Sequence, residues 1–144
     1  EVKTMKRKKR MRILIDGSRE VAKKLASQIE ESYDVEIIMQ PQEALTMIKM
    51  RETAKKTQFY LGEVLVTECK VQVNNQGGIG IVVGLDEELA YQLAIIDAAF
   101  EANLIETQNW LPLLEAEELN IKTRLKAEEA KIYKTKVQFE TMDV

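Results

Sequence analysis

The stretch that decides the fold is LGEVLVTECKVQVNNQGGIGIVVGLDEELAYQLAIIDAAFEA, residues 61–102. Its first part alternates between two sets of side chains and is rich in β-branched residues, which is typical of a strand with one face in a core. The inward face is expected to carry Leu65, Thr67, Cys69, Val71 and Val73, and the outward face Val64, Val66, Glu68, Lys70 and Gln72.

The residues that follow predict a hairpin and a buried helix. Asn74 to Gly78 tolerate positive φ, so we expect the chain to turn back there. Ile79 to Val83 is the predicted returning strand, and it is too apolar for an open sheet edge. Gly84 ends this strand, Asp86 can cap a helix, and Leu89 to Phe100 is apolar almost all round. Strand, hairpin, strand and helix therefore form the predicted core.

The segment before this core predicts two helices. The first covers residues 2–15 and the second residues 19–31. Gly17 can end the first helix, and the Ser18 side chain can cap the second.

Residues 33–53 predict two strands. The first covers residues 33–39. Its inward side chains are expected to be Val35, Ile37 and Met39. Helix propensity and alternation disagree over residues 41–53; we favour a second strand, joined to the first by a short turn at Pro41. Residues 53–58 are expected to form a polar loop.

The C-terminal part predicts a connection and a long polar helix. Residues 104–110 are the expected connection, and the helix runs from Pro112 to about Lys136. The alternating tail, residues 137–142, can add an extended segment. A helix this polar is either solvated or held by another chain, and we favour the second interpretation.

The predicted fold is α+β and occupies residues 1–144 as a single domain. It contains an antiparallel sheet of about four strands, N-terminal helices, a buried helix after the central hairpin and the long C-terminal helix. No apolar run approaches the roughly 20 residues that span a bilayer, and we expect a cytoplasmic location with no membrane partner. Cys69 is the only cysteine, which excludes an internal disulfide.

Charge is unevenly distributed along the chain. Residues 1–85 carry 15 Lys+Arg against 11 Asp+Glu, whereas residues 86–144 carry 6 against 13. This bipolar pattern favours a subunit docked at two surfaces. The basic run at residues 6–12 could contact a nucleic acid, face solvent or rest on an acidic partner. Since no aromatic residue interleaves the run and the pI is about 5.2, we expect no nucleic-acid binding.

The sequence contains no convincing catalytic constellation. Histidine, the commonest general base, is absent. The spacing G-x-G-x-x-G would need glycine at Val83, so we interpret Gly80 as permitting close backbone approach or a bulge. Asp97 is more readily a structural hydrogen-bonding group than a general acid, and Glu63 and Glu68 project from opposite faces of one strand. We therefore predict no catalytic, cofactor-binding or metal-ligating residues.

The order of several short motifs resembles the phosphonate metabolism family PhnG, the small G subunit of the carbon–phosphorus lyase system. The matching residues are Leu61-Gly62-Glu63, Val66-Thr67, Cys69, Gly80, Gly84, Asp86, Ala90 and Ile96-Asp97-Ala98. Residues 135–142, TKVQFETM, are similar to the family's closing T-R-V-D-F-F-T-M, and Gln40-Pro41 with Leu45 and Arg51 fits its earlier hairpin. Two positions depart from the pattern, because Glu68 and Leu85 stand where the family has arginine.

The resemblance implies a role inside a complex. Such proteins assemble with I-type, H-type and J-type subunits, and the I-type subunit is the most expected partner. The wider system transfers an alkylphosphonate onto the ribose of ATP and releases adenine. ATP and alkylphosphonate are therefore expected to be bound by the complex, with the catalytic groups on its larger subunits. Two alternatives remain: a free-standing anion- or nucleotide-binding domain using Gly80 and Gly84, and an enzyme using Asp97 or Glu63 as acid or base.

Overall fold

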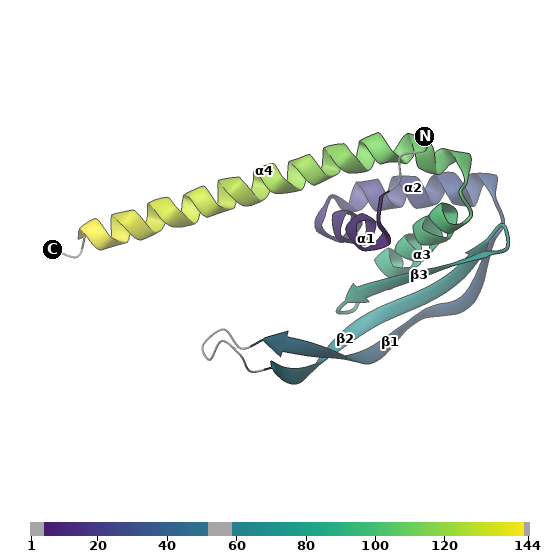
Figure 1. Cartoon of the computed structure of the whole chain (residues 1–144), viewed down its shortest axis with the longest axis horizontal. Helices are drawn as coiled ribbons and strands as arrows, with labels where there is room; N and C mark the ends of the chain where they lie inside the picture. The colour runs from purple at the N-terminus through teal and green to yellow at the C-terminus, as the bar shows by residue number, and fades with distance from the viewer. Residues whose placement is uncertain (1–4, 52–58, 143–144) are drawn as a thin grey trace.

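The computed structural model describes the fold of residues 5–51 and 59–142, and the side chains of residues 5–47 and 62–131. Over these residues, four helices lie on one side of a three-stranded antiparallel sheet (Figure 1), which confirms the α+β class. The elements in chain order are α1 (Arg7–Asp16), α2 (Arg19–Ser32), β1 (Val35–Arg51), β2 (Phe59–Val73), β3 (Gln76–Val83), α3 (Glu87–Glu101) and α4 (Ile105–Met142).

The central hairpin confirms the sequence prediction. β2 and β3 pair antiparallel from Val66↔Val83 to Val73↔Gln76. The two residues between them, Asn74 and Asn75, have φ angles of 52° and 65°. Two consecutive left-handed residues form the tight turn that matches the twist of paired strands, and asparagine tolerates this backbone better than most residues do.

Helix α3 packs directly against the β2–β3 hairpin because two glycines remove the side chains that would separate them. A Cβ at Gly78 would overlap the carbonyl oxygen of Ala94, and a Cβ at Gly80 would overlap that of Ala90. This close approach confirms the interpretation of Gly80. α3 is buried almost all round, as predicted, and its N-terminal amide at Leu89 donates to the Asp86 carboxylate over 3.1 Å.

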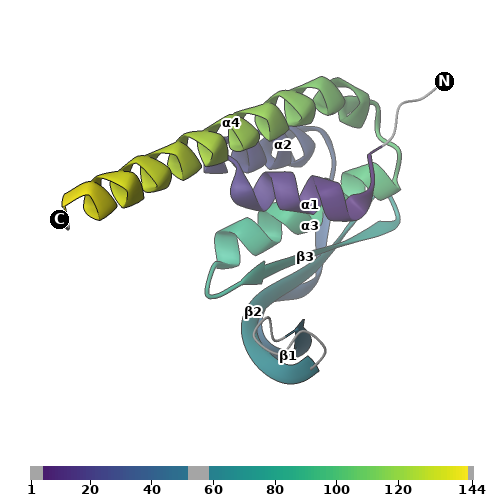
Figure 2. The ribbon, with the colours of Figure 1, turned by 60° about the vertical axis from the view of Figure 1, so that its left-hand side comes forward.

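The core lies between this sheet surface and the helices. It combines the inward side of β2 with α3, with the buried faces of α1 and α2, and with the first turns of α4. Its largest fully buried apolar side chains are Leu14, Leu25, Ile29, Val71, Val73, Leu93, Ile95, Ile96 and Leu114. Figure 2 shows the helical layer on its own side of the sheet, with α1 beside α4.

The prediction of two strands over residues 33–53 is wrong, because residues 35–51 form the single strand β1 and residues 52–53 lie outside the described residues. Pro41 lies inside this strand, where the register with β2 shifts between Met39 and Gln42. β1 is an edge strand, and a proline at a bulge there needs no ladder hydrogen bond from its nitrogen. Ile37, expected to face inward, is exposed because α3 lies mainly over β2 and β3 and covers less of β1 (Figure 1).

Three further strand predictions differ from the structure. Val66, expected on the outward face of β2, is buried. Leu65 is partly exposed whereas Thr67, Cys69, Val71 and Val73 are buried, because β3 ends opposite Val66 and leaves the start of β2 without a covered face. β3 was expected to be too apolar for an edge position, yet it is the second edge strand of the sheet. Its solvent-facing side chains remain apolar in the isolated chain.

The predicted second helix is confirmed as α2, whereas the predicted bounds of the first and last helices differ from those of α1 and α4. The Ser18 hydroxyl accepts from the Glu20 amide over 3.3 Å, as expected for a cap. The predicted first helix begins earlier than α1, and residues 2–4 and the loop at 53–58 lie outside the described residues.

The connection predicted at residues 104–110 is wrong, because α4 starts at Ile105. Asn103, with a φ of 53°, makes the turn from α3, and the amide and hydroxyl of Thr107 both donate to the carbonyl of Leu104. Pro112 therefore lies inside the helix. The extended tail predicted over residues 137–142 is also wrong, since these residues continue α4.

Candidate functional site

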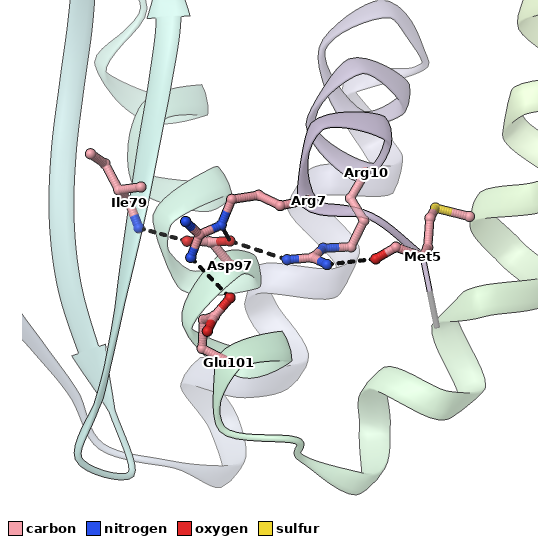
Figure 3. Close-up of polar contacts among 6 residues, drawn as sticks. All are labelled: Met5, Arg7, Arg10, Ile79, Asp97 and Glu101. Atoms are coloured by element: carbon pink, nitrogen blue, oxygen red, sulfur yellow. Dashed lines mark hydrogen bonds and ion pairs between the residues drawn. The ribbon is translucent and has the colours of Figure 1, made fainter. Parts of the chain in front are cut away.

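Asp97 on α3 is the centre of the most connected polar cluster among the described residues. Its side chain is 0% exposed. One carboxylate oxygen accepts from Arg7 Nε over 2.9 Å and from Arg10 over 3.2 Å, and the other accepts from the Ile79 amide over 3.0 Å (Figure 3). The carboxylate thereby joins α1, α3 and the outer edge of β3.

Arg10 is the partner that makes this cluster a buried one. Its side chain is 9% exposed, its guanidinium lies 4.1 Å from the centre of the Phe100 ring, and it also donates to the Met5 carbonyl over 2.8 Å. Burial lowers the pKa of Arg10, and the Asp97 carboxylate opposes that shift. Arg7 is half-exposed and reaches on to Glu101 over 2.9 Å.

This geometry favours a structural role for Asp97 over acid–base chemistry. Both carboxylate oxygens accept hydrogen bonds from N–H groups, one from a guanidinium and the other from a backbone amide. The side chain is fully buried, so a substrate cannot reach either oxygen. A general acid must be within hydrogen-bond reach of a reacting group. Asp97 instead neutralises a guanidinium in the interior and satisfies a strand amide.

A second polar cluster fixes the start of α3. Thr67 Oγ1 donates to the Gly84 carbonyl over 2.6 Å and accepts from the Asp86 amide over 3.1 Å. Asp86 in turn accepts from the Leu89 amide and from both terminal nitrogens of Arg19. Burial raises the pKa of Asp86, but the hydrogen bonds from Arg19 and from the helix amide outweigh it, so that the net shift is downward.

The anion site considered at Gly80 and Gly84 does not suit this arrangement. The Asp86 carboxylate already occupies the N-terminus of α3, where an anion would be expected. The backbone of Gly80 is pressed against α3. A bound anion would have to displace a carboxylate of the same charge.

The remaining residues singled out from sequence are dispersed. Glu63 is exposed and pairs with Met47, whereas Glu68 lies between Gln42 and Ile81 on the sheet. Cys69 is buried, and desolvation raises the pKa of its thiol. Among the described residues, no group of three His, Cys, Asp or Glu side chains has the geometry of a metal site. None of the described helices has both the length and the apolarity needed to cross a membrane.

Sequence reasoning missed the arginines of both clusters. Arg7 and Arg10 belong to the basic run at residues 6–12, and the sequence patterns do not single out Arg19. The available signal was a buried aspartate, which demands a cationic or hydrogen-bonding partner. It could not identify that partner, because Arg10 and Asp97 are 87 positions apart.

A family model described as phosphonate metabolism protein PhnG matches residues 5–143. The chain belongs to the PhnG family. None of the curated proteins compared with the chain matches it. Of the PhnG-like motif residues, Gly80 and Ala90 are the positions where β3 and α3 touch, Asp86 caps α3, and Asp97 ties α1 to the sheet. In this chain, these motif residues therefore lie in the packing around α3.

The two positions that depart from the PhnG pattern are both at the surface of the sheet region. Leu85 is exposed in the link between β3 and α3, and Glu68 is half-buried on β2. Arg19 supplies the guanidinium that pairs with Asp86. An arginine at Leu85 is therefore not required to satisfy that carboxylate in this chain.

Proposed function

We propose that this PhnG-family chain is a non-catalytic, structural subunit of the phosphonate C–P lyase system in the cytoplasm. In this role it supports the transfer of an alkylphosphonate onto the ribose of ATP, with release of adenine. The expected partners are the I-type subunit first and the H-type and J-type subunits second. ATP and the alkylphosphonate are bound by the complex rather than by this chain alone.

The observation that carries this proposal is the set of large apolar side chains that the sheet and its link to α3 leave exposed. Large apolar side chains are exposed on β1, on β3 and on the link to α3. They are Ile37, Ile38, Leu45, Met47, Ile81, Val83 and Leu85. Val83, at 74%, is the most exposed of them. They lie on both faces of the sheet, with Leu45 and Met47 on one face and Ile81 and Val83 on the other. Large exposed apolar side chains of this number are typical of surfaces that another protein covers.

The geometry of β1 and β2 adds to this argument. The two strands continue past the end of β3, pairing from Leu45↔Leu65 to Arg51↔Phe59 as a ribbon without a third strand (Figure 1). A two-stranded ribbon is marginally stable in water on its own. Contact with a partner would bury its apolar side chains and supply the missing packing.

Helix α4 offers a second contact surface. At 38 residues it is about 57 Å long, and its C-terminal part projects away from the helical layer (Figure 1). The core of a domain stabilises little of a polar helix that projects away from it. Packing against a partner would stabilise the projecting part of α4.

Co-purification tests the proposal. The chain is expressed with an I-type subunit, either unaltered or as the Ile81→Lys/Val83→Glu variant, and captured through a tag on the partner. We expect the tagged partner to capture less of the variant than of the unaltered chain. Adenine release by the reconstituted complex should fall in proportion to the amount of chain captured. Ile105→Glu is the matched control, because Ile105 is equally exposed but starts α4, where an acidic residue suits the helix.

Three results would contradict the proposal. The first is turnover of ATP or a phosphonate by the isolated chain. The second is full activity of the complex after the chain is omitted. The third is unaltered assembly of the sheet variant, with its fold verified by circular dichroism.

A further inference from the structure

A groove of about 600 Å³ lies between α1 and α4. These two helices lie side by side on the helical side of the molecule, away from the β1–β2 ribbon (Figure 2). Its floor is aliphatic, formed by Ile13, Ile121 and Leu125. Its rim carries four cationic side chains of the first helix and its cap, Lys6, Lys8, Lys9 and Arg12. Lys122 adds a fifth from α4.

The charges on this rim are only partly compensated, because the two acidic residues that line the groove, Asp16 and Glu118, face five cations. Glu118 lies 3.5 Å from Lys9 and 3.8 Å from Lys122, so one carboxylate is shared between two cations. Lys6, Lys8 and Arg12 form no ion pair with another described residue. Lys8 and Arg12 are also four positions apart on the same helix face, where like charges repel each other.

The start of α1 adds positive potential to the same place. Its first turn contains no acidic residue, and the Lys6 side chain makes no capping hydrogen bond. The partial positive charge of a helix N-terminus is normally matched by acidic side chains, so a basic first turn destabilises the isolated helix. A negatively charged ligand in the groove would relieve both repulsions.

We propose that this groove binds an acidic amphipathic helix of a partner protein. The aliphatic floor takes its apolar face, and the cationic rim pairs with carboxylates along its two flanks, as in other helix-in-groove complexes. A phosphate or nucleotide fits less well, since the floor offers no converging donors and the rim cations stand on separate flexible stems. This site is independent of the sheet surface and does not rest on the proposed phosphonate function.

The test uses the full-length chain and a fluorescein-labelled synthetic helix with leucine at i, i+3, i+4 and i+7 and glutamate on both flanks. Fluorescence anisotropy measures its affinity, and backbone amide shifts locate it. We expect saturable binding that weakens with salt and shifts residues of α1 and α4. Lys8→Glu/Arg12→Glu and, separately, Leu125→Asp should each weaken binding by at least about tenfold.

Leu125 is half-exposed, so Leu125→Asp leaves the core intact. Lys23→Glu/Lys24→Glu, on the exposed face of α2, is the control with the same change of net charge and should bind as the unaltered chain does.

The proposal is overturned if the labelled helix does not bind, or if a scrambled peptide of the same composition binds equally well. It also fails if Leu125→Asp has no effect, which would reduce the interaction to non-specific charge attraction. Stronger binding of a DNA duplex than of the acidic helix would assign the groove to a different ligand class. The same conclusion would follow if ATP displaced the labelled helix at an equal concentration of negative charge.

Discussion

The region around Asp97 and the β1–β2 ribbon differ in how far the chain itself pairs or covers their side chains. Around Asp97, a carboxylate, two guanidinium groups and a strand amide are all paired inside one chain. Along the ribbon, Leu45 and Met47 remain in water and the strands have no covering layer. The difference teaches that the Asp97 cluster is satisfied within one chain, whereas the ribbon leaves its apolar side chains uncovered.

Removing the central carboxylate is the strongest way to break this comparison. Asp97→Ala leaves the Arg10 guanidinium buried without its counter-charge, and we expect the free energy of unfolding to fall by about 3–5 kcal/mol. Urea denaturation measures the loss. Glu101→Ala removes only the exposed partner of Arg7 and should cost less than about 1 kcal/mol. Equal effects of the two substitutions would show that Asp97 is not the anchor of α1.

A smaller loss is expected from separating α3 and the sheet. Gly80→Ala places a methyl group against the Ala90 carbonyl, so α3 must move, and we expect destabilisation of about 1–3 kcal/mol. Gly77→Ala is the matched control, because its added Cβ meets only the Val71 carbonyl oxygen at 4.0 Å. Thermal unfolding followed by circular dichroism distinguishes them, and similar midpoints would contradict the close packing of β3 and α3.

The start of α3 should add a modest pH dependence. Although burial alone raises the pKa of Asp86, its hydrogen bonds bring the folded-state pKa below the ordinary value of 3.8. Its contribution is therefore complete above that value and is lost as the pH falls through the lowered folded-state pKa. Asp86→Asn keeps a capping side chain but loses the charge, and should cost up to about 1 kcal/mol at pH 7.

The measurement is chemical denaturation of both proteins between neutral and acidic pH. The difference in unfolding free energy between them should shrink as the pH is lowered. A difference that stays constant would mean that the Arg19 pair contributes nothing through charge.

The smallest effect on stability is expected on the ribbon. Leu45→Lys exchanges one solvated side chain for another, since Leu45 is 67% exposed, and we expect the unfolding free energy of the isolated chain to change by about 0.5 kcal/mol or less. The same substitution should reduce co-purification with the I-type subunit. A large loss of stability in the isolated chain would show that the ribbon packs against its own domain instead.

Sequence patterns could predict the features that depend on neighbouring residues. Ser18, the Asn74–Asn75 turn and the Asp86 cap are local signals, and each appears in the structure where its chemistry requires it. The predicted turn at Pro41 is wrong because a proline that suits a turn also suits a bulge in an edge strand. The choice between these depends on whether β2 is long enough to pair on both sides of the proline, which no local pattern reveals.

The candidate site was less predictable for a physical reason. The burial of Asp97 follows from the apolar residues around it, but its partners come from a helix whose basic residues look uniformly solvated. Arg7 and Arg10 turn towards α3, whereas Lys8 and Arg12 line the groove beside α4. This division depends on how α1 lies across the helical layer. The isolated helix does not encode it.

The span between Arg10 and Asp97 also bears on how the protein is made. A ribosome releases the N-terminal end first, yet the carboxylate that anchors α1 is synthesised 87 positions later, and the Glu117 side chain that accepts from the Ser18 amide later still. Contacts of such long sequence separation slow folding, because the intervening chain must be ordered before they form. The basic segment is thus synthesised well before the carboxylate that anchors it, and α1 can reach its final place only after α3 has emerged.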